Sequence, residues 1–292
     1  MIIAVTGSSG FLGQNIKQYF LTRGQKIISV PRKVLYDKTA LEQYLQEIDV
    51  VIHTAGTPVT KRWTPRNRKN IYNSRVITTR NIADVIDSMD NPPRVFISTS
   101  AIGIYNNIHY HDESSQDFAD NFLGEVCKDW EAPVKSIKTD KTRTIITRLG
   151  VVLGNGGILK KIMWIFKMGL GGKIGHGEYP MPVIHIKDLL AFYEMSINDE
   201  SFNGVYNLTA PAIITNAEFT EALASALNKK ARFSIPPALL KILYGNGLMS
   251  LINNPIVIPK GLLEAGFRYK YDQIEDALAS CIKKLKNKRI YK

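Results

Sequence analysis

The chain has 292 residues, of which 45% are hydrophobic and 22% charged, a composition typical of a folded globular protein rather than a disordered one. Its net charge is +12, and two cysteines are too few for a disulfide framework, which suits a reducing, cytoplasmic compartment. Residues 1–6 lack a basic segment and a long apolar run, so we expect a strand there and neither a signal peptide nor a membrane anchor.

Apolar runs and amphipathic patterns alternate through the first half of the chain, as a parallel sheet with crossover helices requires. The runs that predict buried strands are residues 2–6, 26–30, 50–55, 95–100 and 144–147. Helical periodicity predicts helices over residues 11–22, 39–48, 66–89 and 121–136. This order predicts an α/β fold of the Rossmann type, with a doubly wound parallel sheet.

The pattern changes from Gly154 onward, where glycines cluster around a helix predicted over residues 159–168. Further along, residues 205–208 are predicted to form a strand. The sequence Thr215-Asn-Ala-Glu218 is a capping box, which predicts the start of a helix that continues to Leu227.

These changes predict two domains. Residues 1–154 are expected to form an NADP-binding Rossmann domain, to which residues 183–210 return. Residues 155–182 and 211–292 are expected to form a smaller, mixed C-terminal substrate domain that packs closely on the first.

Three glycines lie at the junction of the first strand and the first helix, in Val5-Thr-Gly7-Ser-Ser-Gly10-Phe-Leu-Gly13. The first glycine permits a tight turn, the second lets the backbone approach a pyrophosphate, and the third lets the helix pack on the sheet. The helix N-terminus offers free N–H groups to the anion. The motif therefore predicts a dinucleotide site formed by Gly7, Ser9, Gly10, Phe11, Leu12 and Gly13.

The second predicted strand indicates which dinucleotide binds. NAD-binding proteins of this type usually carry an acidic residue about 20 positions beyond the glycines. Here no Asp or Glu occurs between the glycine motif and Asp37. Arg32 and Lys33 follow this strand instead, and a guanidinium can bind a 2′-phosphate through paired hydrogen bonds. We therefore expect NADP (NADPH) rather than NAD; the alternative is that both residues are only surface charges.

The glycine motif and Ser98-Thr-Ser100 together resemble the extended short-chain dehydrogenase/reductases. More closely, the chain resembles the atypical epimerase-family branch with a C-terminal domain of unknown function. The segments that carry this resemblance are Arg62-Trp-Thr-Pro65, Ser74-Arg75, Ser98-Thr-Ser-Ala-Ile-Gly103, Glu125-Val-Cys-Lys-Asp-Trp-Glu131, Arg148-Leu-Gly-Val-Val-Leu-Gly154, Ile184-His-Ile186, Asp188-Leu189, Thr215-Asn-Ala-Glu-Phe219 and Leu262-Leu-Glu-Ala-Gly-Phe267.

The resemblance implies which residues occupy the cofactor and catalytic positions. Arg75 stands near the cofactor where relatives carry Asn, and Ser100 keeps the upstream Ser. Leu123 and Cys127 occupy the positions of the usual catalytic Tyr and Lys. The expected cofactor contacts beyond the glycine motif, Arg32 and Lys33 are Ala55, Gly56, Arg75 and Leu149.

Ordinary relatives pass a proton through the Tyr, whose pKa the Lys lowers, but none of the 13 tyrosines here has a Lys four residues later. Our candidate catalytic residues are Ser100, Tyr105 and Cys127. Tyr105 is the best candidate acid, or else an aromatic wall beside the nicotinamide. Cys127 lies in an apolar helical stripe, where a cysteine usually packs as a small hydrophobe.

Histidines offer two weaker alternatives. His185 precedes a predicted helix and is either an acid/base or a core residue. His109-Tyr-His111-Asp-Glu113 is expected to be a polar loop, because no further ligand spacing supports a metal site.

The basic residues suggest partners. Lys61, Arg62, Arg66, Arg68 and Lys69 lie beside the expected cofactor site, where they suit a phosphate or an anionic substrate. The basic residues among positions 283–292 are expected to form a solvated tail rather than to bind nucleic acid.

We expect an NADP(H)-dependent oxidoreductase or epimerase-like enzyme with an atypical site. Its substrate would be a small polar molecule, with a homodimer left open. Alternatives are a non-catalytic NADP(H) sensor and, on charge alone, a nucleic-acid module.

Overall fold

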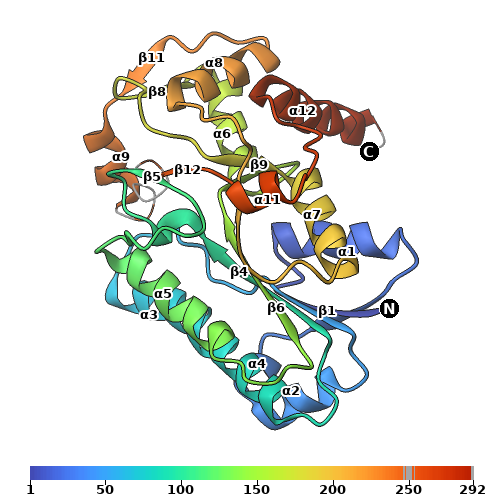
Figure 1. Cartoon of the computed structure of the whole chain (residues 1–292). Coiled ribbons are helices and arrows are strands. Elements are labelled where there is room, and N and C mark those ends of the chain that lie inside the picture. The colour runs from blue at the N-terminus through green and yellow to red at the C-terminus, as the bar shows by residue number, and fades with distance from the viewer. Residues whose placement is uncertain (246, 248–251, 253, 291–292) are drawn as a thin grey trace.

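The computed structural model describes residues 1–245, 247, 252 and 254–290. Six parallel strands form its central sheet, in the spatial order β2-β1-β3-β4-β6-β10 (Figure 1). These strands are β1 (Ile2–Thr6), β2 (Lys26–Val30), β3 (Val50–His53), β4 (Val95–Ala101), β6 (Arg143–Leu149) and β10 (Gly204–Leu208). The sheet confirms the predicted Rossmann-type α/β fold.

The strand order creates a crevice. From β1 the chain passes to β2 on one side, and it later returns to the other side of β1 as β3. Loops that leave neighbouring parallel strands in opposite directions open a gap at the carboxyl ends of the strands, where such folds bind ligands. The glycine motif follows β1 and residues 54–56 follow β3, so both line this gap.

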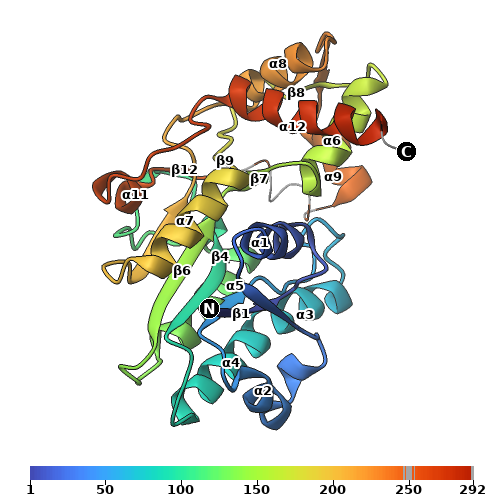
Figure 2. The same ribbon diagram turned by 90° about the vertical axis from the view of Figure 1, so that its right-hand side faces the viewer.

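Helices cover both faces of the sheet. One face carries α1 (Phe11–Leu21) and α7 (Ile186–Asn198), and the other carries α2 (Lys38–Leu45), α4 (Val76–Ser88) and α5 (Phe122–Lys135), as both ribbon views show (Figures 1 and 2). Side chains alternate along each strand to supply both cores. In β1, Ile3 and Val5 pack with α1 and α7, whereas Ala4 packs with α2 and α4.

The single helix predicted over residues 66–89 is wrong, because the structure contains α3 (Pro65–Asn73) and α4 instead. The break lies at Ser74 and Arg75, where Arg75 has φ −115° and ψ −66°. The Ser74 hydroxyl accepts a hydrogen bond from the backbone of Thr57, and the Arg75 guanidinium donates to the Thr57 carbonyl. These contacts to the loop after β3 replace regular helical geometry at this point.

The second unit lies at the top of both ribbon views. Its helices are α6 (Gly157–Lys167), α8 (Asn216–Ala226), α9 (Pro237–Tyr244) and α12 (Ile274–Ile290), whereas α11 (Lys260–Glu264) packs on β10 of the central sheet. Short strands pair as β7 (Val151–Leu153) with β9 (Val183–His185), β8 (Gly172–Ile174) with β11 (Phe233–Ile235), and β5 (Tyr110–His111) with β12 (Ile256–Val257). Two short 3₁₀ turns are η1 (Val34–Tyr36) and η2 (Ile102–Ile104).

Local sequence signals explain the start of α8. Thr215 accepts from the Glu218 backbone, and the Glu218 carboxylate accepts from the Thr215 backbone, which confirms the predicted capping box. α8 then buries Phe219 and Leu223 against α6 and α12 to form a second apolar core.

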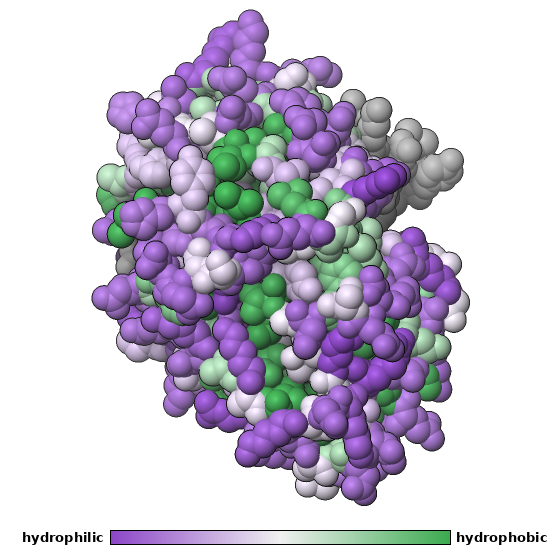
Figure 3. Space-filling model, in the orientation of Figure 1, coloured by the Kyte–Doolittle hydropathy of each residue, from purple (hydrophilic) through white to green (hydrophobic). Residues whose placement is uncertain are grey.

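The surface is mostly hydrophilic on the face drawn in Figure 3, with apolar residues gathered in a few places. None of the helices in the described part of the chain is long and apolar enough to cross a membrane. The basic residues among positions 283–292 are predicted to be solvated, and their side chains lie outside the described residues.

Candidate active site

The glycine motif closes tightly onto the neighbouring strand. Gly7 has φ +63°, and a Cβ there would lie 2.7 Å from the Thr54 carbonyl oxygen and 2.9 Å from Ala55 Cα. A Cβ on Gly13 would lie 2.4 Å from the Gly7 carbonyl oxygen. Distances this short leave no room for a side chain, so these glycines bring α1 against β1 and the loop after β3.

The N-terminus of α1 faces the crevice uncapped. Its N-cap, Gly10, has no side chain to accept from the first turn, and that turn contains no acidic residue. The N–H groups of a first helical turn lack partners within the helix and carry the positive end of the helix dipole. Ser9 and Gly10 are exposed, and Phe11 and Leu12 are half-buried. This cradle fits the pyrophosphate of a dinucleotide.

Phe11 connects the glycine motif to the second unit. A Cβ on Gly154 or Gly156 would lie 2.7 or 2.6 Å from the Phe11 ring. The ring therefore occupies space that the glycines leave free. This contact explains why the glycine-rich sequence after β7 lies directly over the start of α1.

Arg32 and Lys33 follow β2 and are both exposed. Among the described residues neither forms an ion pair with a carboxylate. These two cations have no acidic partner there, and they follow the strand that pairs with β1. Their charge and position suit the binding of a 2′-phosphate.

Arg75 lies beside the loop after β3. Its guanidinium donates to the Thr57 carbonyl at 2.9 Å and the Ile71 carbonyl at 3.3 Å. It also lies 5.1 Å from the centre of the Trp130 ring and would be 3.0 Å from a Cβ on Gly56. Burial lowers the pKa of Arg75 to about 10. Ala55, Gly56 and Arg75 are thus brought together, whereas Leu149 lies farther along the sheet, paired with Ala101.

A buried network surrounds Ser100. The Ser100 hydroxyl donates to Glu131 Oε1 at 2.8 Å, and Arg148 binds both Glu131 oxygens at 2.8 and 2.7 Å. Arg148 and Glu131 side chains are 2% and 1% exposed, so the pair is fully desolvated. Burial alone would raise the pKa of Glu131, but the hydrogen bonds and charge of Arg148 outweigh it, and the pKa falls below its usual value.

Tyr105 belongs to the same network. Its hydroxyl lies 2.6 Å from Arg148 Nη1, and 2.9 Å from both Asn207 Oδ1 and the Asp112 carbonyl. The residue is 2% exposed and its ring stacks on His111. Burial raises the pKa of Tyr105, although the Arg148 charge opposes the shift. These contacts hold the loop after β4 in place, and they occupy the Tyr105 hydroxyl with three hydrogen-bond partners.

Cys127 packs in an apolar cluster with Ile102, Ile104, Tyr105 and Val257. It is 3% exposed, and burial, with a smaller contribution from the Glu131 charge, raises its pKa to about 12. A thiol in such surroundings keeps its proton at neutral pH. At the usual Tyr position, Leu123 lies 3.9 Å from where a Cβ on Gly103 would be.

His53 is a site residue that sequence reasoning did not single out. It is fully buried at the end of β3, where Thr6 Oγ1 lies 2.7 Å from Nδ1 and Thr78 Oγ1 lies 3.3 Å from Nε2. Burial, with the Arg75 charge, lowers its pKa to about 3. It therefore joins β1, β3 and α4 as a neutral imidazole.

Sequence reasoning also assigned no role to Glu131 and Arg148, although the pattern around them could have indicated one. Each is a charged residue on a face that its neighbours predict to be buried, Glu131 one turn after Cys127 and Arg148 within an apolar strand. Buried charges of opposite sign are usually paired.

The histidine alternatives have structural roles. His185 caps α7 by accepting from the Lys187 backbone at 3.2 Å, and its ring lies 4.0 Å from that of Tyr271. In the described part of the chain, no group of three or more His, Cys, Asp or Glu side chains could hold a metal ion.

Comparisons with known proteins agree with this geometry. The family model described as the NAD dependent epimerase/dehydratase family matches residues 3–209, and a domain of unknown function (DUF1731) matches residues 235–281. The human epimerase family protein SDR39U1 is 30% identical over 97% of this chain and 100% of its own length. An Arabidopsis thaliana homologue named as chloroplastic is 31% identical over 95% of this chain and 86% of its own length.

Solved structures extend the comparison. The chain is similar to human SDR39U1 (isoform 2), solved with NADPH, with a TM-score of 0.89 and 28% identity over 96% of this chain and 99% of that one. It also shares its fold with a UDP-glucose 4-epimerase from Thermotoga maritima, at a TM-score of 0.78 and 15% identity, over 99% of this chain and 100% of that one.

Proposed function

Because the chain belongs to the NAD-dependent epimerase/dehydratase family, we propose that it binds NADP(H) at the carboxyl ends of β1 and β3 and is an oxidoreductase with an atypical site. The observation that carries the proposal is the glycine cradle at the uncapped N-terminus of α1, with Arg32 and Lys33 at the adjoining strand end. The NADPH in the similar human structure supports the choice of cofactor.

Different groups of the chain would bind different parts of the cofactor. The backbone N–H groups at the start of α1 bind the pyrophosphate, and the Arg32 and Lys33 cations bind the 2′-phosphate. Arg75, fixed over the loop after β3, lines the crevice with a positive charge. When bound, the nicotinamide supplies hydride chemistry.

Proton transfer is where this site differs from that of ordinary short-chain dehydrogenase/reductases, which use a Tyr and a Lys. Leu123 has no titratable proton, and Cys127 holds its proton at neutral pH. The Ser100 and Tyr105 hydroxyls are engaged by Glu131 and Arg148. We therefore assign Ser100 and Tyr105 to holding the loop after β4 in place, and a proton needed for turnover would come from solvent.

The same observation favours a second candidate function. Since none of Ser100, Tyr105 and Cys127 presents a free acid or base, the chain is also suited to sensing NADPH without turning it over.

Charge reversal at the end of β2 tests the cofactor assignment. The double variant R32E/K33E should weaken NADPH binding about 10-fold to 100-fold, because charge-assisted hydrogen bonds contribute roughly 1.5–3 kcal/mol. NADH binding should change little. Calorimetric titration of both cofactors measures the difference, with K229E, an exposed charge reversal in the second unit, as the control. Equal losses for both cofactors would place the two cations outside the 2′-phosphate site.

Turnover separates the two functions. An oxidoreductase should oxidise NADPH with members of a carbonyl and quinone panel, and Y105F and S100A should retain activity in proportion to their folded fraction. A sensor should bind NADPH without oxidising it. Loss of turnover in a fully folded Y105F would instead restore Tyr105 as the proton donor.

A further inference from the structure

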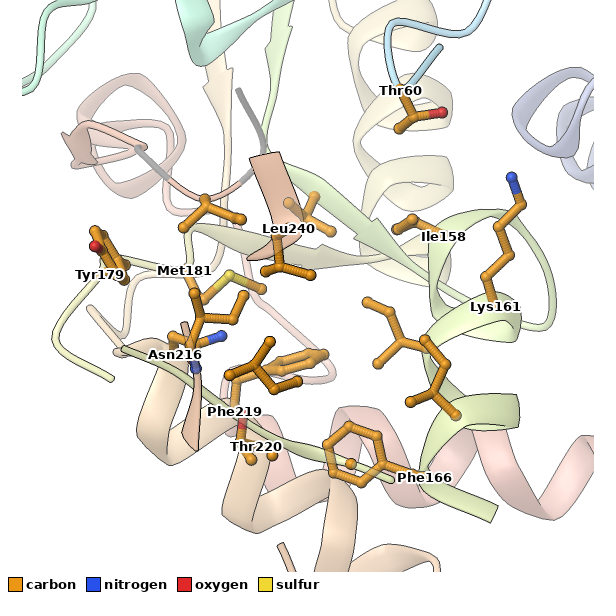
Figure 4. Close-up of a pocket in the computed structure, with 18 residues that line it drawn as sticks. Thr60, Ile158, Lys161, Phe166, Tyr179, Met181, Asn216, Phe219, Thr220 and Leu240 are labelled. Carbon is orange, nitrogen blue, oxygen red and sulfur yellow. The ribbon is translucent and has the colours of Figure 1, made fainter. Parts of the chain in front are cut away.

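A pocket of about 260 Å³ lies within the second unit, between α6, α8 and α9 and the pair β8–β11 (Figure 4). Its walls are predominantly apolar and include Ile162, Ile165, Phe166, Met181, Phe219 and Leu240. Figure 4 shows Phe166, Met181 and Phe219 around the same central space. Such a lining favours an apolar occupant over water, because a water molecule needs several polar partners.

Few polar groups line this pocket: the Lys161 cation, the Asn216 amide, and the hydroxyls of Thr60, Tyr179 and Thr220. Lys161 lies at its edge, and no Asp or Glu is among its lining residues. Asn216 is fixed by accepting from the Ile174 backbone at 2.7 Å through Oδ1, while its Nδ2 donates to no described residue. A ligand with a negative end would therefore meet Lys161 without facing a carboxylate.

The pocket adjoins the proposed cofactor site. Thr60, from the loop after β3, lies at its upper edge in Figure 4. Ile158 lines it directly after Gly157, where a Cβ would lie 3.1 Å from the Phe11 ring. Elements that shape the crevice thus continue into the wall of the pocket.

We propose that this pocket binds the apolar part of the substrate, which is an amphipathic acid whose anionic group lies near Lys161. A cavity of about 150 Å³ admits a benzene ring, so this one has room for an aromatic ring or a chain of roughly eight carbons. The inference rests on the proposed function, since it identifies the class of substrate that NADP(H) chemistry would act on. It replaces the expectation of a small polar substrate and keeps the anionic group.

The test uses octanoate and its neutral counterpart, 1-octanol, titrated into the full chain saturated with NADPH. Octanoate should bind, and 1-octanol should bind more weakly. L240W, which fills the pocket, should weaken octanoate binding at least tenfold. L239W is the matched control, since Leu239 is the exposed neighbour outside the lining.

The charge is tested separately on α6. K161M should weaken octanoate binding about twofold to fivefold, as expected for an exposed ion pair, and leave 1-octanol binding unchanged. K160M, at the exposed neighbouring position outside the lining, should change neither.

The outcomes distinguish the two proposals. No octanoate binding to the NADPH-bound chain, or equal affinity in L240W and wild type, overturns the pocket assignment while leaving the cofactor site intact. Equal binding of octanoate and 1-octanol overturns the anionic class. Failure of NADPH itself to bind overturns the proposed function instead.

Discussion

Buried polar side chains decide how the candidate site is held. Glu131 and Arg148 lose nearly all contact with water, and desolvating two ions costs more than their attraction returns unless their hydrogen bonds are complete. Here Ser100, Tyr105 and Lys135 supply the remaining partners. The pair therefore serves less to stabilise the fold than to fix the position of the loop after β4.

His53 makes stability depend on pH. Its pKa of about 3 in the folded chain lies below the value of about 6.5 expected after unfolding. Between these values the unfolded state binds more protons, so stability is complete above pH 6.5 and is lost as the pH falls. At pH 5 the loss should be about 2 kcal/mol.

Urea unfolding at several pH values measures this dependence. H53N should flatten the fall in unfolding free energy between pH 7 and pH 5, although it is less stable at pH 7 because hydrogen bonds to Thr6 and Thr78 are lost. H176N, at an exposed histidine, should follow the wild-type profile. Parallel profiles for H53N and wild type would contradict the assignment.

At the level of elements, α5, which carries Leu123 and Cys127, shows how a helix is fixed beside the candidate site. Its buried face includes Val126, Cys127, Trp130 and Val134, which packs it under the sheet. Gly124 lets the start of the helix approach the preceding loop, because a Cβ there would lie 2.1 Å from the Ala119 carbonyl oxygen.

Replacing this glycine should disturb the packing. G124A should destabilise the chain by about 1–3 kcal/mol, the usual cost of overpacking, even though alanine favours helix. G103A is the matched control, because the nearest atoms to its Cβ would be 3.9 Å away. Thermal unfolding compares the two, and a G124A variant as stable as G103A would show that the loop yields at little cost.

At the scale of the whole molecule, Asp188 links the Rossmann unit to the C-terminal segment of the chain. It lies on α7, and its carboxylate accepts from the backbones of Lys270 and Tyr271 at 2.9 and 3.1 Å. Burial raises the pKa of Asp188 despite these hydrogen bonds. The carboxylate thereby anchors the segment that leads into α12 to a helix of the Rossmann unit.

D188N should loosen this anchor, because an amide has one acceptor oxygen where the carboxylate has two. We expect a loss of about 1–3 kcal/mol, the cost of leaving a buried donor unpaired. Hydrogen exchange should rise in residues 268–282 more than in β1. D199N, at an exposed Asp that accepts from Ser201, is the control. Unchanged exchange in both variants would show that apolar packing alone holds the segment.

Much of this architecture was predictable because it depends on local patterns. The alternation of apolar runs and helices indicated the sheet, and the glycine spacing indicated the turn between β1 and α1. The break at Arg75 was not predictable, since residues 66–89 have continuous helical periodicity. The helix is interrupted where Ser74 and Arg75 bond to Thr57, a residue of the loop after β3.

By itself the sequence determined the fold class and the dinucleotide cradle, because hydrophobic period and glycine conformation act over a few residues. The tertiary structure decided what surrounds the cradle: the engagement of Tyr105 by Arg148, the burial of Cys127, and an apolar pocket lined from α6, α8 and α9. These features depend on residues tens of positions apart meeting in one place, and burial then sets their charge and reactivity.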